Sequence, residues 1–201
     1  MKFFRLNDKT ALDVMRSSPQ GRSMTASSTA DFVPIRSLHH FAWRCRDCEE
    51  TRHFYEDLLG LPLVHVIKSD VVPSTGEYCP YVHIFFQMRD GSYIAFFDLG
   101  DDTAAQPSPN TPAWVNHLAL RVDSVAELEQ AKARLQAAGI EVLGVTDHHI
   151  IRSIYFFDPN GIRLELTTPT VDGAEMNQLA RRAHQEVRDW TAFKARRKAS
   201  A

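Results

Sequence analysis

Two histidines and one carboxylate stand in this sequence at positions from which they could bind one metal ion. His40 lies in the stretch LHHFAWRCRD and His117 in VNHLALRVDS, and both stretches read His, apolar, Ala, apolar, Arg from that histidine. Glu165 lies in the run IRLELT. Two imidazoles and one carboxylate form the facial triad that suits a non-haem Fe(II) site with open positions.

Residue alternation predicts that these three side chains face away from the hydrophobic core. Successive side chains of a β-strand point to opposite faces, so the leucines of NHLALRV would pack under a helix and leave His117 opposite. The same phase places Phe41, Trp43 and Cys45 on the core face of the first stretch and His40 opposite. A polar group in mid-strand is costly to bury without a partner. Either metal binding or hydrogen bonds among the three side chains would explain them.

The stretches around the two histidines each begin a repeated module of strand, helix, strand, strand, strand. The first helix is expected in DCEETRHFYEDLLGL and the second in SVAELEQAKARLQAAGI, each with a capping residue at its start and a glycine at its end. Asp90-Gly91 and Asn160-Gly161 are hairpin signals between the last two strands of each module. The modules are expected over 37–99 and 114–169.

Three further segments complete the predicted organisation. Residues 1–36 are expected to be an N-terminal extension and the Pro-rich residues 100–113 a linker. Residues 170–201 are expected to form an amphipathic helix. Its apolar stripe should pack on the body of the protein or on a second subunit, and it consists of Met176, Leu179, Ala180, Ala183, Val187, Trp190 and Phe193.

Composition is typical of a globular protein that needs no membrane or nucleic acid. The 201 residues are 44% hydrophobic with a net charge of −2, and no apolar run approaches the ~20 residues of a membrane span. Three cysteines suggest a reducing, cytoplasmic environment. The pair Cys45 and Cys48 could be a zinc or redox motif, or two small residues at a strand-to-helix junction.

The repeated module and its motifs resemble the vicinal oxygen chelate superfamily, which includes glyoxalase I, antibiotic-resistance proteins and type I extradiol dioxygenases. The resemblance covers about 37–169 and includes FYEDLLGLPL after the first strand and SIYFFDPNGIRLEL at the end. It implies an α+β fold in which two tandem βαβββ modules form a cupped half-barrel sheet around a divalent metal, followed here by a C-terminal helix. Family members often dimerise, so a homodimer is expected.

By this resemblance the metal ligands are His40, His117 and Glu165. A fourth family ligand would fall at Ala95, so the site resembles a three-ligand Fe(II) dioxygenase more than glyoxalase I. Tyr155 matches the position where extradiol dioxygenases place a tyrosine that hydrogen-bonds the substrate. Mn(II) or Zn(II) would accept the same ligands.

The histidine base of the extradiol enzymes has no counterpart in the hairpin MRDGSYIA. His83, which aligns with Ser153 on the face of Tyr155, and His148 or His149 in TDHHIIRS are the possible substitutes. Alternatively, His83 fills space and the other two lie in a solvated loop.

The resulting hypothesis is an Fe(II)-dependent extradiol-type dioxygenase that cleaves a small catechol-like substrate with O2. Tyr155 and a nearby histidine, His148 or His83, would supply acid–base catalysis. Aromatic side chains on the same strand face would line the substrate pocket, and these are Phe85, Tyr93 and Phe97. The alternatives are a glyoxalase-type lyase, isomerase or transferase that needs no redox change, and a metal-free ligand-binding module.

Overall fold

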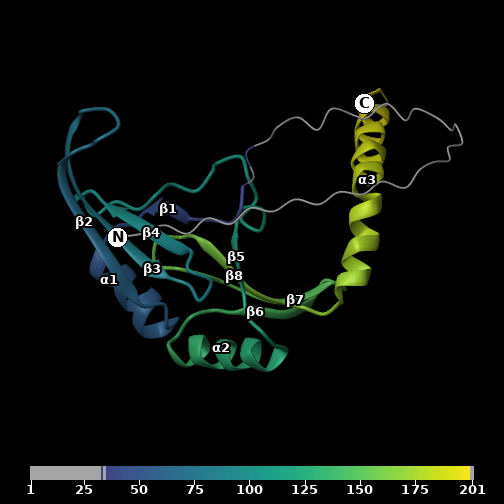
Figure 1. Ribbon diagram of the computed structural model, residues 1–201, viewed down its shortest axis with the longest axis horizontal. Coiled ribbons are helices and arrows are strands. Elements are labelled where there is room, and N and C mark those ends of the chain that lie inside the picture. The colour runs from purple at the N-terminus through teal and green to yellow at the C-terminus, as the bar shows by residue number, and fades with distance from the viewer. Residues whose placement is uncertain (1–32, 34, 200–201) are drawn as a thin grey trace, which may run out of the picture. The chain divides into compact units, whose positions relative to one another are not determined.

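The element order strand, helix, strand, strand, strand occurs twice in the chain and is followed by a long helix (Figure 1). The computed structural model describes residues 33 and 35–199, so the extension expected over 1–36 lies almost wholly outside the described residues. Residues Ser37–Ala201 form one unit. The first module comprises β1 (His40–Arg44), α1 (Cys48–Arg52), η1 (His53–Leu58), β2 (Leu63–Val71), β3 (Tyr78–Gln87) and β4 (Tyr93–Asp98). The second comprises β5 (Leu118–Arg121), α2 (Val125–Ala137), β6 (Leu143–Asp147), β7 (Ile151–Phe157) and β8 (Arg163–Pro169). The predicted α+β fold, with two such modules and a C-terminal helix α3 (Gly173–Ala199), is confirmed.

Each module forms its own four-stranded mixed sheet. The strand order is β1-β4-β3-β2 in the first sheet and β5-β8-β7-β6 in the second. In both sheets the first and last strands of the module are parallel neighbours and the other pairs are antiparallel. The two modules are therefore equivalent in topology as well as in sequence.

Local signals in the sequence start and stop the helices. The side chain of Asp47 caps α1 by accepting a hydrogen bond from the Glu50 amide, and Ser124 caps α2 through the Glu127 amide. Gly60 and Gly139 end the two helices with φ of 77° and 80°. The first helix differs from expectation because it widens into the π-helical turn η1, in which the consecutive Phe54 and Tyr55 are both buried.

A shared core fills the space between the helices and the sheets. α1 contacts β4, and α2 contacts β7 and β8, so each helix covers one face of its own sheet. The largest fully buried side chains come from both modules, and they include Tyr55, Phe86, Phe96 and Phe156. The helices leave the other face of each sheet for the predicted site.

Polar side chains also join the two modules. The Tyr55 hydroxyl donates to Asp158 Oδ2 at 3.0 Å, and Asn160 Nδ2 donates to Thr51 Oγ1 at 3.1 Å. The Arg46 amide donates to Asn160 Oδ1 at 2.9 Å. The first module thus contacts the β7–β8 hairpin through its helix and the loop before it.

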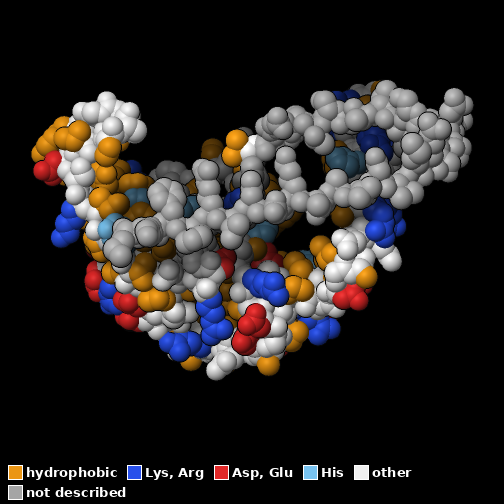
Figure 2. Space-filling view, viewed as in Figure 1, with side chains coloured by type: hydrophobic (Ala, Val, Ile, Leu, Met, Phe, Trp, Pro, Cys, Tyr) orange, Lys and Arg blue, Asp and Glu red, His pale blue; other side chains and the backbone are white. Residues whose placement is uncertain are grey.

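Several apolar side chains remain exposed. No described residue of α3 is buried, and Trp190 stacks on Phe193 at its surface, so the predicted stripe does not pack on the body. The edge strand β2 exposes Val64 and Val66, and Figure 2 shows hydrophobic side chains gathered over the β2–β3 hairpin at the upper left.

Candidate metal and substrate site

The second sheet brings His117 and Glu165 into direct contact. His117 precedes β5, and Glu165 pairs with Ala119 on one side and with Tyr155 on the other. His117 Nε2 lies 2.9 Å from Glu165 Oε2. The glutamate side chain is only 3% exposed, whereas the histidine is 33% exposed. Two of the three predicted ligands therefore meet, with the imidazole on the open side.

Hydrogen bonds fix the orientation of both side chains. The buried Ser153 hydroxyl donates to Glu165 Oε1 at 2.5 Å, which leaves Oε2 for the histidine. His117 Nδ1 lies 3.0 Å from the Val115 carbonyl oxygen. A carbonyl only accepts, so Nδ1 is the donor of this contact. Nε2 faces the carboxylate, and a proton or a metal ion between Nε2 and Oε2 would each account for their contact.

The donor set fits a divalent metal ion. Imidazole nitrogen and carboxylate oxygen bind such ions at about 2.0–2.2 Å, which places two ligand atoms at right angles about 3.0 Å apart. The observed separation of 2.9 Å between His117 Nε2 and Glu165 Oε2 matches this spacing. The contact between His117 Nδ1 and a backbone carbonyl is also the arrangement that metal-binding histidines usually have.

A tyrosine–histidine pair lies beside these two residues. Tyr155 Oη is 2.8 Å from His148 Nε2, and its ring meets the His117 ring edge-on at 6.1 Å between centroids. The guanidinium of Arg163 lies 4.5 Å over the Tyr155 ring. Burial raises the pKa of the Tyr155 hydroxyl, with a smaller contribution from Glu165. Of the two adjacent histidines in the loop before β7, His148 is the one that contacts Tyr155.

The first sheet gathers the remaining predicted side chains on the equivalent face. His83 stacks on Phe97 at 3.6 Å between ring centroids and lies 4.2 Å from Phe85. Phe85 in turn contacts His40 at 5.8 Å and Tyr93 at 6.1 Å. His83 is 7% exposed, and its Nε2 is buried without a hydrogen-bond partner among the described residues. Burial, together with neighbouring imidazoles, lowers its pKa to about 4.

His40 does not join the His117–Glu165 pair within one chain. Within residues 33 and 35–199, no three His, Cys, Asp or Glu side chains converge on a possible metal position. Ala95 is the counterpart of Glu165 in the first sheet, because Phe85 pairs with Ala95 as Tyr155 pairs with Glu165. Each sheet thus carries part of the predicted site.

A cavity of about 670 Å³ adjoins the second part of the site. His117 and Arg163 line it together with Phe41 and Trp43 of β1 and residues of the linker. Alternation predicted that Trp43 lies on the core face of its strand, but Trp43 is 39% exposed and lines the cavity.

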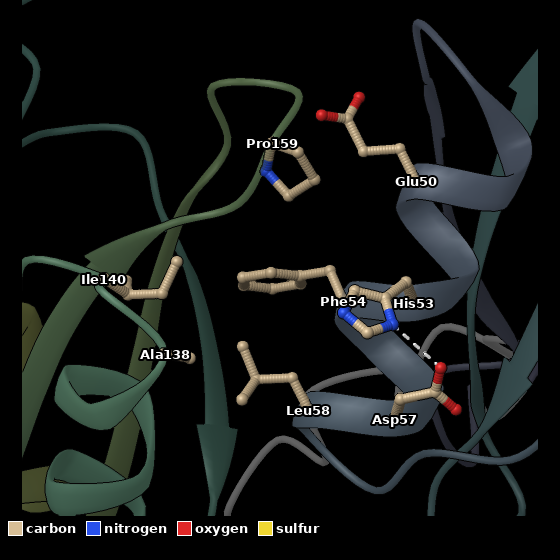
Figure 3. Close-up of a pocket in the computed structure, with 8 residues that line it drawn as sticks. All are labelled: Glu50, His53, Phe54, Asp57, Leu58, Ala138, Ile140 and Pro159. Carbon is tan, nitrogen blue, oxygen red and sulfur yellow. Dashed lines mark hydrogen bonds and ion pairs between the residues drawn. The ribbon is translucent and has the colours of Figure 1, made fainter.

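A smaller hollow of about 240 Å³ lies on the helical side of the molecule, between η1 and the end of α2 (Figure 3). Phe54 and Leu58 point into it, and the His53–Asp57 contact lies at its edge. None of the predicted site residues lines this hollow, so it is separate from the candidate site.

The chain belongs to the Glyoxalase/Bleomycin resistance protein/Dioxygenase superfamily, whose family model matches residues 37–166. A relative from Bacillus subtilis, the uncharacterized protein YwkD, is 32% identical over 135 residues, which cover 66% of this chain and 96% of the relative. No helix among the described residues has both the length and the apolar character needed to cross a bilayer.

Solved structures share the fold. A glyoxylase/bleomycin resistance protein/dioxygenase domain from Frankia matches with a TM-score of 0.55 and 17% identity, over 68% of this chain and 99% of that chain. A variant of the fosfomycin resistance protein FosX from Listeria monocytogenes, in complex with Mn(II) and a dihydroxypropylphosphonic acid, matches with a TM-score of 0.50 and 22% identity. That match covers 69% of this chain and 96% of that chain.

Proposed function

We propose that this protein is a metal-dependent enzyme, an extradiol-type dioxygenase that acts on a small catechol-like substrate with Fe(II) and O2. The proposed ligands are His40, His117 and Glu165. The observation that carries the proposal is the His117–Glu165 pair, whose Nε2 and Oε2 atoms lie 2.9 Å apart, the spacing of two ligands of one metal ion. The adjacent Tyr155–His148 pair supplies the acid–base groups that the reaction needs.

Tyr155 and His148 form a route for the substrate proton. In this arrangement the substrate hydroxyl donates to Tyr155 Oη, which passes its own proton to His148 Nε2 at 2.8 Å. The raised pKa of the Tyr155 hydroxyl keeps it protonated at neutral pH and therefore able to donate. Such positioned proton transfer typically contributes ~10²–10⁴ in rate.

The first sheet provides the surface for the substrate ring. Phe85, Tyr93 and Phe97 form an aromatic face around His83. The low pKa of His83 keeps this imidazole neutral, so the whole face favours a flat, uncharged ring. A bound divalent metal would polarise the two adjacent oxygens of the substrate and lower the pKa of their hydroxyls, and Fe(II) would in addition pass electron density from the substrate to O2.

We further propose that a second copy of the chain completes the site. His40 and the His117–Glu165 pair are not joined within one chain, although each lies on the open face of its sheet. The exposed apolar side chains of β2 and α3 offer surface for such a homodimer.

The cysteines Cys45, Cys48 and Cys79 are all free, which supports the proposal of a reducing, cytoplasmic location.

Oxygen consumption tests the reaction. Anaerobically iron-loaded protein is mixed with a panel of catechols, and uptake of one O2 per substrate, with a ring-opened product, is expected. Glu165→Gln should abolish both iron binding and O2 uptake. Glu129→Gln, which changes an exposed residue of α2, should change neither. Turnover without O2 would favour the glyoxalase-type alternative instead, and catechol binding by protein that takes up no metal would favour a binding module.

Mixing two inactive variants tests the shared site. His40→Ala and His117→Ala each remove one ligand, so each homodimer should lack activity. If the site joins two copies, heterodimers formed by mixing should regain one intact site, and up to about a quarter of full activity for random pairing. No recovery in verified heterodimers would refute the shared site while leaving the metal proposal open to the iron measurement.

A further inference from the structure

The cavity beside His117 has the size and lining of a binding site that the proposed reaction does not use. Its volume of about 670 Å³ falls within the range of roughly 300–1,000 Å³ that small-molecule sites occupy. Its walls are the face of β1 opposite His40, the linker from Ala105 and the end of the β7–β8 hairpin. The proposed substrate face of the first sheet, around His83, does not contribute to it.

One wall is a flat aromatic surface. Phe41 and Trp43 project from the same face of β1, and their rings stack with centroids 5.5 Å apart and planes inclined by only 12°. Trp43 remains 39% exposed although it lies on the apolar face of its strand. Aromatic rings of a ligand pack favourably on such a surface, in offset or edge-on geometry.

The wall formed by the β7–β8 hairpin carries one permanent positive charge without a negative partner among the described residues. Arg163 lines the cavity, forms no ion pair with a described residue, and stacks its guanidinium on the ring of Tyr155. Its Nε is buried and has no hydrogen-bond partner among residues 33 and 35–199. A buried donor without a partner is costly. Among the residues that the structure describes, no Asp or Glu lines the cavity.

We propose that this cavity binds a planar aromatic carboxylate of two or three fused rings. The rings lie against Trp43 and Phe41, and the carboxylate accepts hydrogen bonds from the guanidinium of Arg163, whose fork matches carboxylate geometry. The aromatic wall and Arg163 belong to none of the proposed metal ligands, and His117 is the one proposed ligand in the lining. Titration with and without a metal ion therefore separates binding in the cavity from the proposed reaction.

Tryptophan fluorescence measures the binding in the full-length protein. 2-Naphthoate is titrated into the protein in EDTA and again with Mn(II), and 2-naphthamide serves as the uncharged probe of the same shape. We expect 2-naphthoate to quench the emission and to bind at least tenfold more tightly than the amide, a difference of about 1.4 kcal/mol, because the carboxylate forms charge-assisted hydrogen bonds with Arg163. Trp43→Phe should abolish the quenching, whereas Trp190→Phe on α3 should preserve it.

Arg163→Gln identifies the group that binds the carboxylate. It should weaken 2-naphthoate about tenfold and leave 2-naphthamide unchanged. Arg152→Gln, on the neighbouring strand β7 and outside the cavity, removes the same charge and should change neither affinity. The carboxylate–amide comparison on the native chain stands even if the Arg163 variant fails to fold.

Three results would overturn the proposal. Equal affinity of the native protein for the two probes would show that Arg163 does not recognise the charge. An absence of quenching at millimolar 2-naphthoate would show that the cavity does not take a ring on Trp43. A dimer in which acrylamide cannot reach Trp43 would show that a second copy covers the cavity. Metal binding, measured separately, decides the proposed function independently of these outcomes.

Discussion

Ser153→Ala should weaken metal binding without removing any metal ligand. The Ser153 side chain is fully buried, and its hydroxyl donates to Glu165 Oε1, the oxygen that does not contact His117. Replacing it removes a charge-assisted hydrogen bond and leaves the buried carboxylate less firmly oriented. Losses of such supporting partners typically weaken metal affinity about 10- to 100-fold, or about 1.4–2.7 kcal/mol of binding free energy.

Mn(II) titration followed by electron paramagnetic resonance gives the dissociation constant without any assumption about substrate. Ser92→Ala is the matched control. Ser92 is 4% exposed, lies in the β3–β4 hairpin of the first module, and also donates to a carboxylate, Asp90 Oδ1. Its Mn(II) affinity should equal that of the native protein. A Ser153→Ala dissociation constant within twofold of the native value, or equal losses in both variants, would refute the role assigned to this hydroxyl.

The remaining predictions concern stability and rate. Tyr55→Phe removes the donor to Asp158 and should lower the free energy of unfolding in urea by about 1.5–3 kcal/mol, whereas Tyr81→Phe, whose hydroxyl has no described partner, should not. His83 has a pKa of about 4 in the fold against an ordinary value of 6.5, so its contribution to stability is present above pH 6.5 and is lost as pH falls towards 4. The loss should reach at most about 3 kcal/mol, and metal-free His83→Phe should show that much less pH dependence between pH 7 and 4 in urea titrations. Tyr155→Phe should lower kcat for O2 uptake by ~10²–10⁴ and leave Mn(II) affinity unchanged, and an unaltered kcat would remove Tyr155 from the proton route.

Alternation along strands predicted which side chains share a face, because that property is local. Tyr155 and Ser153 were predicted to share a face, and the pairing of β7 with β8 places Glu165 beside them. The equivalence of Ala95 and Glu165 could likewise be predicted, since both modules keep the same distance between hairpin and strand. Because the strand and hairpin pattern occurs twice in the sequence, the fold could be predicted from the sequence alone.

The alternation of residues does not predict which element packs on a given face of a strand or helix. The expectations for β1 and α3 were therefore incomplete. Phe41, Trp43 and Cys45 were predicted to share the core face, and Cys45 is 1% exposed and Phe41 packs against the core, but Trp43 is 39% exposed. Trp43 instead lines the cavity. In the same way the stripe of α3 correctly predicted an amphipathic helix, but none of its described residues is buried in the chain. A stripe of apolar residues predicts that a helix packs on another surface, but it does not identify that surface.

The contacts between the two modules could not be predicted from the repeated sequence pattern. Asn160 was predicted to form the hairpin turn, and Asp158 joins it there, since Asp158 Oδ1 accepts from the Asn160 and Ile162 amides. Their remaining polar atoms reach across to Tyr55 and Thr51. The equivalent turn of the first module begins with Met88, which cannot accept such bonds, so the junction has no symmetric counterpart. The hydrogen bonds that join the two modules therefore lie at positions where the repeat is broken, which is why the repeat alone does not predict them.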